Sequence, residues 1–116
     1  MLLGGDQLDI DKEILKGYID TIILSLLCEK PLYGFEMAKK VRTISRDEFE
    51  LKEGTLYLAL KRLEINGFVE TFWGDQPSDG GRRKYYRILP QGKTRLEKKK
   101  AEWEFVKKMM DVFLGV

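Results

Sequence analysis

The chain has 116 residues, enough for one domain, and its hydrophobic fraction of 43% and charged fraction of 34% exclude collagen-like, low-complexity and strongly disordered sequences. The formal net charge is only +2, but residues 82–100 hold nine Lys or Arg against one acid, Glu97, and such a local excess of cations attracts polyanions, of which nucleic acid is the usual one. No apolar run approaches the roughly 20 residues that cross a bilayer and no secretory signal opens the chain, so we expect no membrane segment and a cytoplasmic location.

The first predicted element is a helix over residues 11–29, ended by Pro31. Its apolar residues recur every three or four positions, as in a helix with a wide buried face: Leu15, Tyr18, Ile19, Ile22, Ile23, Leu26 and Leu27. Cys28, the only cysteine, lies at the end of this face, where we expect a buried thiol rather than a nucleophile. Because histidine is also absent, an intrachain disulfide is impossible, and we expect no metal, no cofactor and no enzyme activity.

A second helix is predicted from Gly34 to about Val41, followed by a polar connection over residues 43–52 with a short extended piece near Phe49 and Leu51. A third helix is predicted over residues 53–66, with Gly67 as a left-handed cap.

The third helix has two different faces. Its core side carries Leu56, Ala59, Leu60 and Leu63, and its other side carries Gly54, Thr55, Tyr57, Leu58, Lys61 and Arg62. A hydroxyl, a phenol, an apolar tip and two cations suit contacts with phosphates, base edges and thymine methyl groups. The alternative for Lys61 and Arg62 is that they are ordinary solvated charges.

Two strands follow, over residues 68–73 and 82–89, separated by the turn-forming residues 74–81. Asp79, Gly80 and Gly81 predict an exposed hairpin tip, and three cations come next: Arg82, Arg83 and Lys84. Such a hairpin, or wing, can contact the sugar-phosphate backbone or the minor groove while a helix occupies the major groove. Alternatively, these charges only solubilise the hairpin.

Pro90 opens a last helix, which we expect to run to about Phe113. A heptad-like seam of Leu96, Trp103, Val106, Met110 and Phe113 lies beside a second stripe of Phe105, Met109 and Val112. One helix of a small domain cannot easily bury both stripes alone. We therefore expect a homodimer whose interface is formed by the seam and by Leu15, with residues 90–116 as a dimerisation helix attached to a domain of residues 1–89.

The order of these elements predicts a mostly helical α+β fold, the winged helix-turn-helix, with the third helix as the recognition helix. The sequence resembles the PadR family of transcriptional regulators, in particular its compact members, which include multidrug sensors. The stretches that carry the resemblance are PLYGFEM at residues 31–37, EGTLY at 53–57, KRLE at 61–64 and GGRRKYYRI at 80–88, together with Trp103. They span nearly the whole chain in the family's order.

The resemblance implies a homodimeric repressor that binds double-stranded operator DNA with an inverted repeat and controls a detoxification, efflux or stress gene. By matched position it implies DNA contacts at Tyr33, Gly34, Thr55, Tyr57 and Lys61 and at the wing residues Gly81, Arg82, Arg83 and Lys84. Leu58 stands where a proline or a small residue is common, which leaves the operator sequence open. Leu89-Pro90 replaces the usual Leu-Thr and affects the helix cap.

Trp103 has two interpretations, packing within the interface or stacking on a ligand. In the drug-sensing members that the chain resembles, the matching tryptophans line a central pocket for planar aromatic or hydrophobic effectors. The other positions matched to that pocket, or near it, are Ile14, Gly17, Tyr18, Thr21 and Lys107, although Lys107 and the nearby Asp20 do not suit a purely apolar pocket. The alternative to a DNA-binding regulator is a winged-helix module that binds only proteins.

Overall fold

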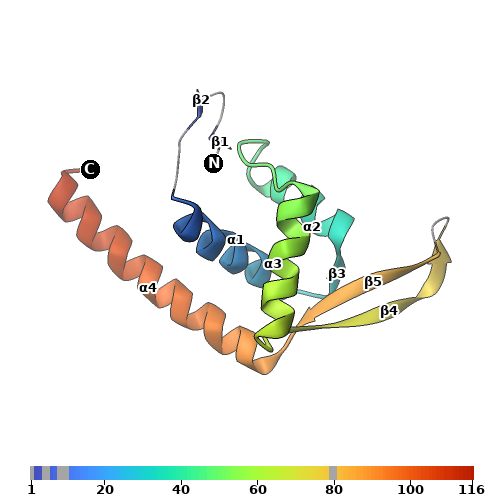
Figure 1. Cartoon of the computed structure of the whole chain (residues 1–116). Helices are drawn as coiled ribbons and strands as arrows, with labels where there is room; N and C mark the ends of the chain where they lie inside the picture. Colours follow the sequence, from blue (N-terminus) through green and yellow to red (C-terminus); the bar gives the residue numbers. More distant parts are fainter. Residues whose placement is uncertain (1, 4–5, 8–10, 79–80) are drawn as a thin grey trace.

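The computed structural model describes residues 2–3, 6–7, 11–78 and 81–116. A two-stranded ladder of β1 (Leu2–Leu3) and β2 (Asp6–Gln7) precedes the first helix, and the remaining described elements are four helices and a three-stranded sheet (Figure 1).

Helix α1 (Lys12–Leu27) begins at Asp11, whose carboxylate accepts hydrogen bonds from the backbone N–H groups of Glu13 and Ile14 at 2.9 and 3.3 Å. Five of its residues are buried, namely Ile19, Ile23, Leu24, Leu26 and Leu27, as the predicted apolar face requires. The prediction of a buried Cys28 is wrong, because α1 ends at Leu27 and the cysteine lies beyond the buried face, exposed to solvent.

Strand β3 (Leu32–Tyr33) leads directly into helix α2 (Gly34–Ile44), whose start is fixed by the Glu36 carboxylate accepting the Tyr33 N–H at 3.2 Å. The predicted extended piece near Phe49 and Leu51 is not a strand. Instead, the Ser45 hydroxyl bonds both the N–H and the carbonyl of Phe49, at 3.1 Å each, and Leu51 is buried in the core. The connection is therefore held by the Ser45 hydroxyl and by backbone turns, such as the bond from the Glu48 N–H to the Ser45 carbonyl at 3.0 Å, and not by a ladder.

Helix α3 (Glu53–Ile65) ends as the sequence predicts. Gly67 has a φ of 75°, and the N–H groups of Gly67 and Phe68 bond the carbonyls of Glu64 and Leu63 at 3.0 and 2.9 Å. These two hydrogen bonds end the helix and direct the chain into the sheet.

The sheet has the antiparallel order β3-β5-β4, and its long hairpin consists of β4 (Val69–Ser78) and β5 (Gly81–Ile88). Its strands extend further than predicted. Residues 74–78 were expected to be loop, yet the ladder resumes at Pro77↔Arg82 and Ser78↔Gly81 after an irregularity between Trp73 and Pro77. A bulge of this kind absorbs extra residues and lets pairing continue toward the tip.

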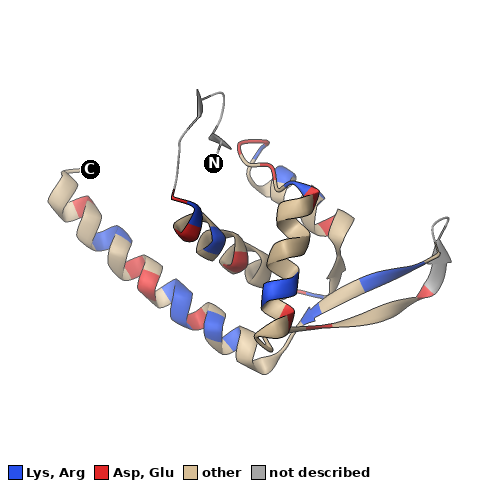
Figure 2. Cartoon of the chain, in the orientation of Figure 1, with Lys and Arg blue, Asp and Glu red and all other residues tan. Residues whose placement is uncertain are grey.

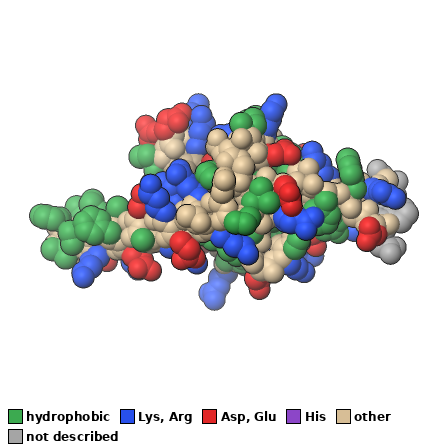
Figure 3. All heavy atoms as spheres, turned by 90° about the horizontal axis from the view of Figure 1, so that it is seen from below, with side chains coloured by type: hydrophobic (Ala, Val, Ile, Leu, Met, Phe, Trp, Pro, Cys, Tyr) green, Lys and Arg blue, Asp and Glu red, His purple; other side chains and the backbone are tan. Residues whose placement is uncertain are grey.

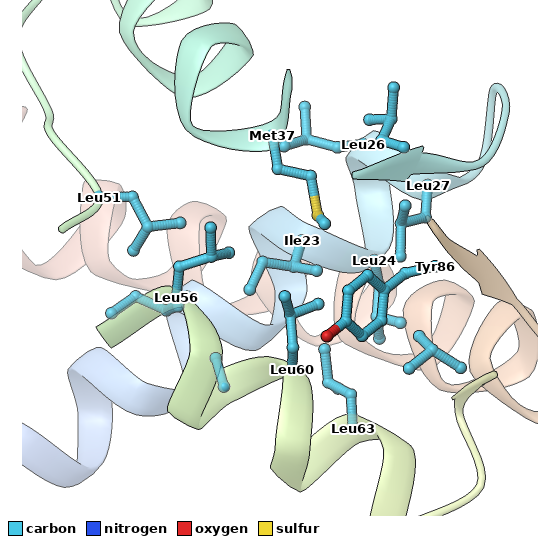
Figure 4. Close-up of a cluster of buried hydrophobic side chains, with 14 of the residues drawn as sticks. Ile23, Leu24, Leu26, Leu27, Met37, Leu51, Leu56, Leu60, Leu63 and Tyr86 are labelled. Carbon is cyan, nitrogen blue, oxygen red and sulfur yellow. The ribbon is translucent and has the colours of Figure 1, made fainter. Parts of the chain in front are cut away.

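Helix α4 (Pro90–Leu114) opens with Pro90 in its first turn and ends at Gly115, which is left-handed with a φ of 73°. Leu96 of α4 joins the core, which is formed mainly by α1, α2, α3 and the base of the sheet (Figure 4). The arrangement confirms the predicted α+β winged helix-turn-helix with a long C-terminal helix: α2 and α3 are the two helices, and β4 and β5 form the wing (Figure 1).

Gly92 fixes the point where α4 leaves the domain. A Cβ atom there would collide with the backbone carbonyl of Phe68 and lie 2.8 Å from Cγ1 of Ile88. We therefore expect Gly92→Ala to lower the free energy of unfolding by about 1–3 kcal/mol, measured by chemical denaturation.

Gly54 is the matched control, because it lies in the first turn of α3 with open space around its Cα. Gly54→Ala is expected to leave stability unchanged or to raise it slightly. Equal losses in the two variants would contradict the close contact at Gly92.

Candidate functional site

Helix α3 presents one buried and one exposed side. Leu56, Ala59, Leu60 and Leu63 are buried as predicted, and helical geometry then turns Gly54, Leu58 and Lys61 most directly away from the core. Thr55, Tyr57, Leu58 and Lys61 are all exposed. The outward surface thus combines an apolar side chain with a cation, and no ion pair with another described residue holds Lys61.

Tyr57 connects this surface to the start of α2. Its hydroxyl lies so close to Gly34 that a Cβ atom at that position would collide with it, so a larger residue there would displace the Tyr57 ring. Tyr57 is also near Tyr86 of the wing. Burial raises the pKa of the Tyr86 phenol, and the neighbouring Tyr57 and Glu64 raise it further.

Tyr33 connects α2 to the wing. Its ring makes an edge contact with Tyr85, with centroids 5.4 Å apart, and stacks on Phe35 at 6.5 Å. The guanidinium of Arg83 lies 4.6 Å from the centre of the same ring. Four predicted site residues therefore converge from three elements: Tyr33 and Gly34 at the start of α2, Tyr57 on α3 and Arg83 on β5.

The remaining wing residues lie further along the hairpin. Gly81, Arg82 and Lys84 are exposed on β5, with the Lys84 ammonium 5.8 Å from the centre of the Tyr86 ring (Figure 2). Asp79 and Gly80 of the predicted tip lie outside the described residues.

Trp73 is an exposed residue of the wing that the sequence pattern did not single out. It pairs with Lys84 across the hairpin, and 60% of its side chain is exposed. A tryptophan in a strand usually indicates core, and only the register of the hairpin reveals that this one stands beside the basic strand.

Arg62 does not share the free position of Lys61. Its guanidinium binds the Asp20 carboxylate of α1, with 2.7 Å between Nη2 and Oδ1 and 3.4 Å between Nε and Oδ2. The sequence predicts six residues on the recognition surface of α3. Arg62 is one of them, and its side chain is turned toward α1.

A groove of about 700 Å³ runs between α1 and α4. It brings together five of the predicted effector residues, namely Ile14, Gly17, Tyr18, Thr21 and Trp103, and Val106 also lines it. The rings of Tyr18 and Trp103 meet edge to face at 6.0 Å, while 53% of Trp103 stays exposed. Lys107 is not among the lining residues. The charged residues that line the groove are instead Glu13 of α1 and Lys99 and Glu102 of α4.

Two of these charges neutralise each other. The Lys99 ammonium lies 3.1 Å from Glu102, and this hydrogen bond holds the pKa of the Glu102 carboxyl below its ordinary value. The groove is therefore apolar at its centre, with charged side chains among its lining.

Beyond Leu96, α4 has no buried residue. Trp103, Val106, Met110 and Phe113 of the predicted seam are 53%, 47%, 47% and 81% exposed, and hydrophobic side chains gather at the C-terminal end of the helix (Figure 3). Leu96 was predicted to face a partner, and this is wrong, because it is 2% exposed within the core of its own subunit. Leu15 is half-buried against the same core.

Among the described residues, no His, Cys, Asp and Glu side chains gather in a group of three that could hold a metal ion. Within the same part of the chain, none of the helices has the length and apolar character needed to cross a membrane.

Comparisons with known proteins agree with this architecture. The model of the transcriptional regulator PadR-like family matches residues 23–98, more than half of the chain. An uncharacterised protein from Lysinibacillus sphaericus is 41% identical over 105 residues, which cover 90% of this chain and 95% of that protein.

Solved structures are similar over nearly the same length. A transcriptional regulator from Clostridium thermocellum has a TM-score of 0.78 and 42% identity, covering 90% of this chain and 98% of its own. A PadR family transcription regulator from Clostridium difficile has a TM-score of 0.75 and 53% identity, covering 84% of this chain and 99% of its own. From these matches, the chain belongs to the PadR-like family of transcriptional regulators, which implies DNA-binding regulation.

Proposed function

We propose that this protein is a homodimeric repressor that occupies an inverted-repeat operator and blocks transcription of a detoxification, efflux or stress gene. The observation that carries the proposal is the convergence of Tyr33, Gly34, Tyr57 and Arg83 at one junction of α2, α3 and the wing. Close contacts between three elements and one exposed cation, Arg83, meet there, as a surface for the DNA backbone and grooves requires.

In the proposed complex α3 enters the major groove. Thr55, Tyr57, Leu58 and Lys61 are its contact residues, and the wing residues Gly81, Arg82, Arg83 and Lys84 contact the backbone or the minor groove alongside. Tyr33 and Gly34 hold the start of α2 against the phosphates. Arg62 of the same helix is bound to Asp20 and is not one of these contact residues.

Lys61→Gln tests this arrangement. If Lys61 contacts a phosphate, the variant loses affinity roughly fivefold for each subunit near physiological salt, and the slope of log affinity against log salt falls by about one for each subunit. Fluorescence anisotropy with a labelled duplex from the promoter upstream of this protein's own gene measures both quantities.

Lys108→Gln is the matched control, because Lys108 is an exposed lysine near the C-terminal end of α4, outside the cationic stretch of residues 82–100. It should retain wild-type affinity and slope. A wild-type protein that binds no promoter fragment at low salt would refute the proposal and favour a winged-helix module that binds only proteins.

The exposed apolar face of α4 supports dimerisation through residues 90–116. A patch of this size on a free subunit is typical of an interface, and a second copy with the same seam is its simplest complement. Dimerisation also places two recognition helices about 34 Å apart, the repeat of the DNA major groove.

We expect Met110→Glu to convert the dimer to a monomer in sedimentation velocity at micromolar concentration, because an unpaired charge would be buried in the seam. Lys108→Glu introduces the same residue on the other side of α4 and should remain dimeric. A wild-type chain that sediments as a monomer would contradict the interface.

The groove between α1 and α4 supports a ligand role for Trp103, with release of DNA when a planar hydrophobic effector changes the spacing of the two wings. Such a ligand can act only if it binds the two dimer shapes with different affinity. The half-exposed indole of Trp103 and the small residue Gly17 both line this groove, and the indole provides a flat apolar wall for such a ligand.

Since the chain has two tryptophans, Trp73→Phe leaves Trp103 as the only indole. We expect an aromatic dye that does not bind duplex DNA, such as 1-anilinonaphthalene-8-sulfonate, to quench its fluorescence with micromolar affinity and to weaken promoter binding at least fivefold. Trp103→Leu should abolish the effect on promoter binding. Quenching without any change in DNA affinity would show that the dye is not an effector.

A further inference from the structure

The ion pair between Arg62 and Asp20 joins two helices that are 42 positions apart in the sequence. The guanidinium meets the carboxylate with two nitrogens, at 2.7 and 3.4 Å, in the fork geometry that arginine forms with carboxylates. Arg62 is 33% exposed and Asp20 is 26% exposed, so both ends of the pair are largely enclosed.

No other ion pair between described residues resembles it. Three of the other pairs each join residues three positions apart within a single helix, one in α1 and two in α4. The fourth joins Glu70 to Arg87 across the wing. Ile23 of α1 and Leu60 of α3 belong to one buried cluster, so close packing also holds the two helices together. To this packing the Arg62–Asp20 pair adds a two-pronged hydrogen-bonded contact, which depends on the angle between the helices.

Arg62 is also poorly placed to bind DNA directly. A helix advances by about 100° for each residue, so that Lys61 points outward while Arg62 points toward α1. To reach a phosphate, Arg62 would have to leave Asp20, and the half-buried carboxylate would lose its partner.

We propose that Arg62 is a positioning residue, which fixes the angle of the recognition helix against α1 through Asp20 and does not contact DNA. The inference rests on the proposed function, because the angle of α3 matters through the fit of its outward face to the major groove. A tilted α3 would lose base contacts, while the sequence-independent attraction between the wing cations and the DNA backbone would persist.

Asp20→Asn is the decisive variant, because it leaves Arg62 intact and removes only the charge that holds it. We expect affinity for the operator duplex to fall about tenfold, as for a coupled pair. Affinity for a random duplex of equal length and the salt dependence of operator binding should both stay at wild-type values. Circular dichroism and sedimentation velocity verify that the fold and the assembly are retained.

Arg62→Lys is a second, milder variant, which tests the same contact with less risk that the protein fails to fold. It keeps the charge but cannot form the two-pronged contact, so operator affinity should fall with an unchanged salt slope. Arg62→Asp places two carboxylates together and should bind the operator worst, and the exchange Asp20→Arg with Arg62→Asp should recover part of the loss.

Two outcomes would overturn the inference while wild-type operator binding remains. One is an Arg62→Gln variant whose salt slope falls by about one per subunit, as expected for Lys61→Gln, because Arg62 would then be a phosphate contact. The other is an Asp20→Asn variant with wild-type or tighter operator binding. If the wild-type protein binds no promoter DNA at all, the proposed function itself fails, and the inference fails with it.

Discussion

The burial of one apolar face of α1 is the interaction on which the rest of the molecule depends. Ile23 is completely buried, and Ile19, Leu24 and Leu27 are nearly so. Around them pack α2, α3, the base of β5 and the first turns of α4 (Figure 4). Because the hydrophobic effect is roughly proportional to the area removed from water, this shared contact is what brings elements far apart in the chain into one body.

The same helix takes part in every candidate function of the protein. On one side Asp20 holds the recognition helix, and on another Ile14, Gly17 and Thr21 line the groove under Trp103. A change in the position of α1 therefore alters both the groove and the direction of α3. The proposed effector acts on the spacing of the DNA-binding elements. Because α1 contacts both the groove and α3, it can couple the two directly, without a series of intervening residues.

Local patterns in the sequence were enough to predict much of the fold. The three- and four-residue spacing of α1 and α3, the left-handed Gly67 and Pro90 at the start of α4 act within a few residues, and each predicted feature is present. The features that were missed depend on contacts distant in sequence. Leu96 fits the heptad seam as well as Met110 does, and only the position of α1 decides that it is core.

The candidate site also has features that local sequence predicts and features that depend on contacts distant in sequence. The basic β5 and the outward face of α3 could be predicted because charge and helical period are local properties. The partner of Arg62 lies 42 residues away, and the pairing of Trp73 with Lys84 depends on the register of a hairpin whose ladder is irregular between Trp73 and Pro77. Neither can be derived from spacing alone.

The missing side chain at Gly92 has a consequence for the geometry of the whole assembly. Because the backbone of α4 rests directly on the carbonyl of Phe68, the helix leaves the domain in a direction set within its first turn. Its 25 residues extend for about 37 Å, so a small change in the angle of its first turn displaces its C-terminal end by a much larger distance. In the proposed dimer, the contact at Gly92 therefore helps to set the distance between the two DNA-reading units, although Gly92 itself is not among the residues that line the groove.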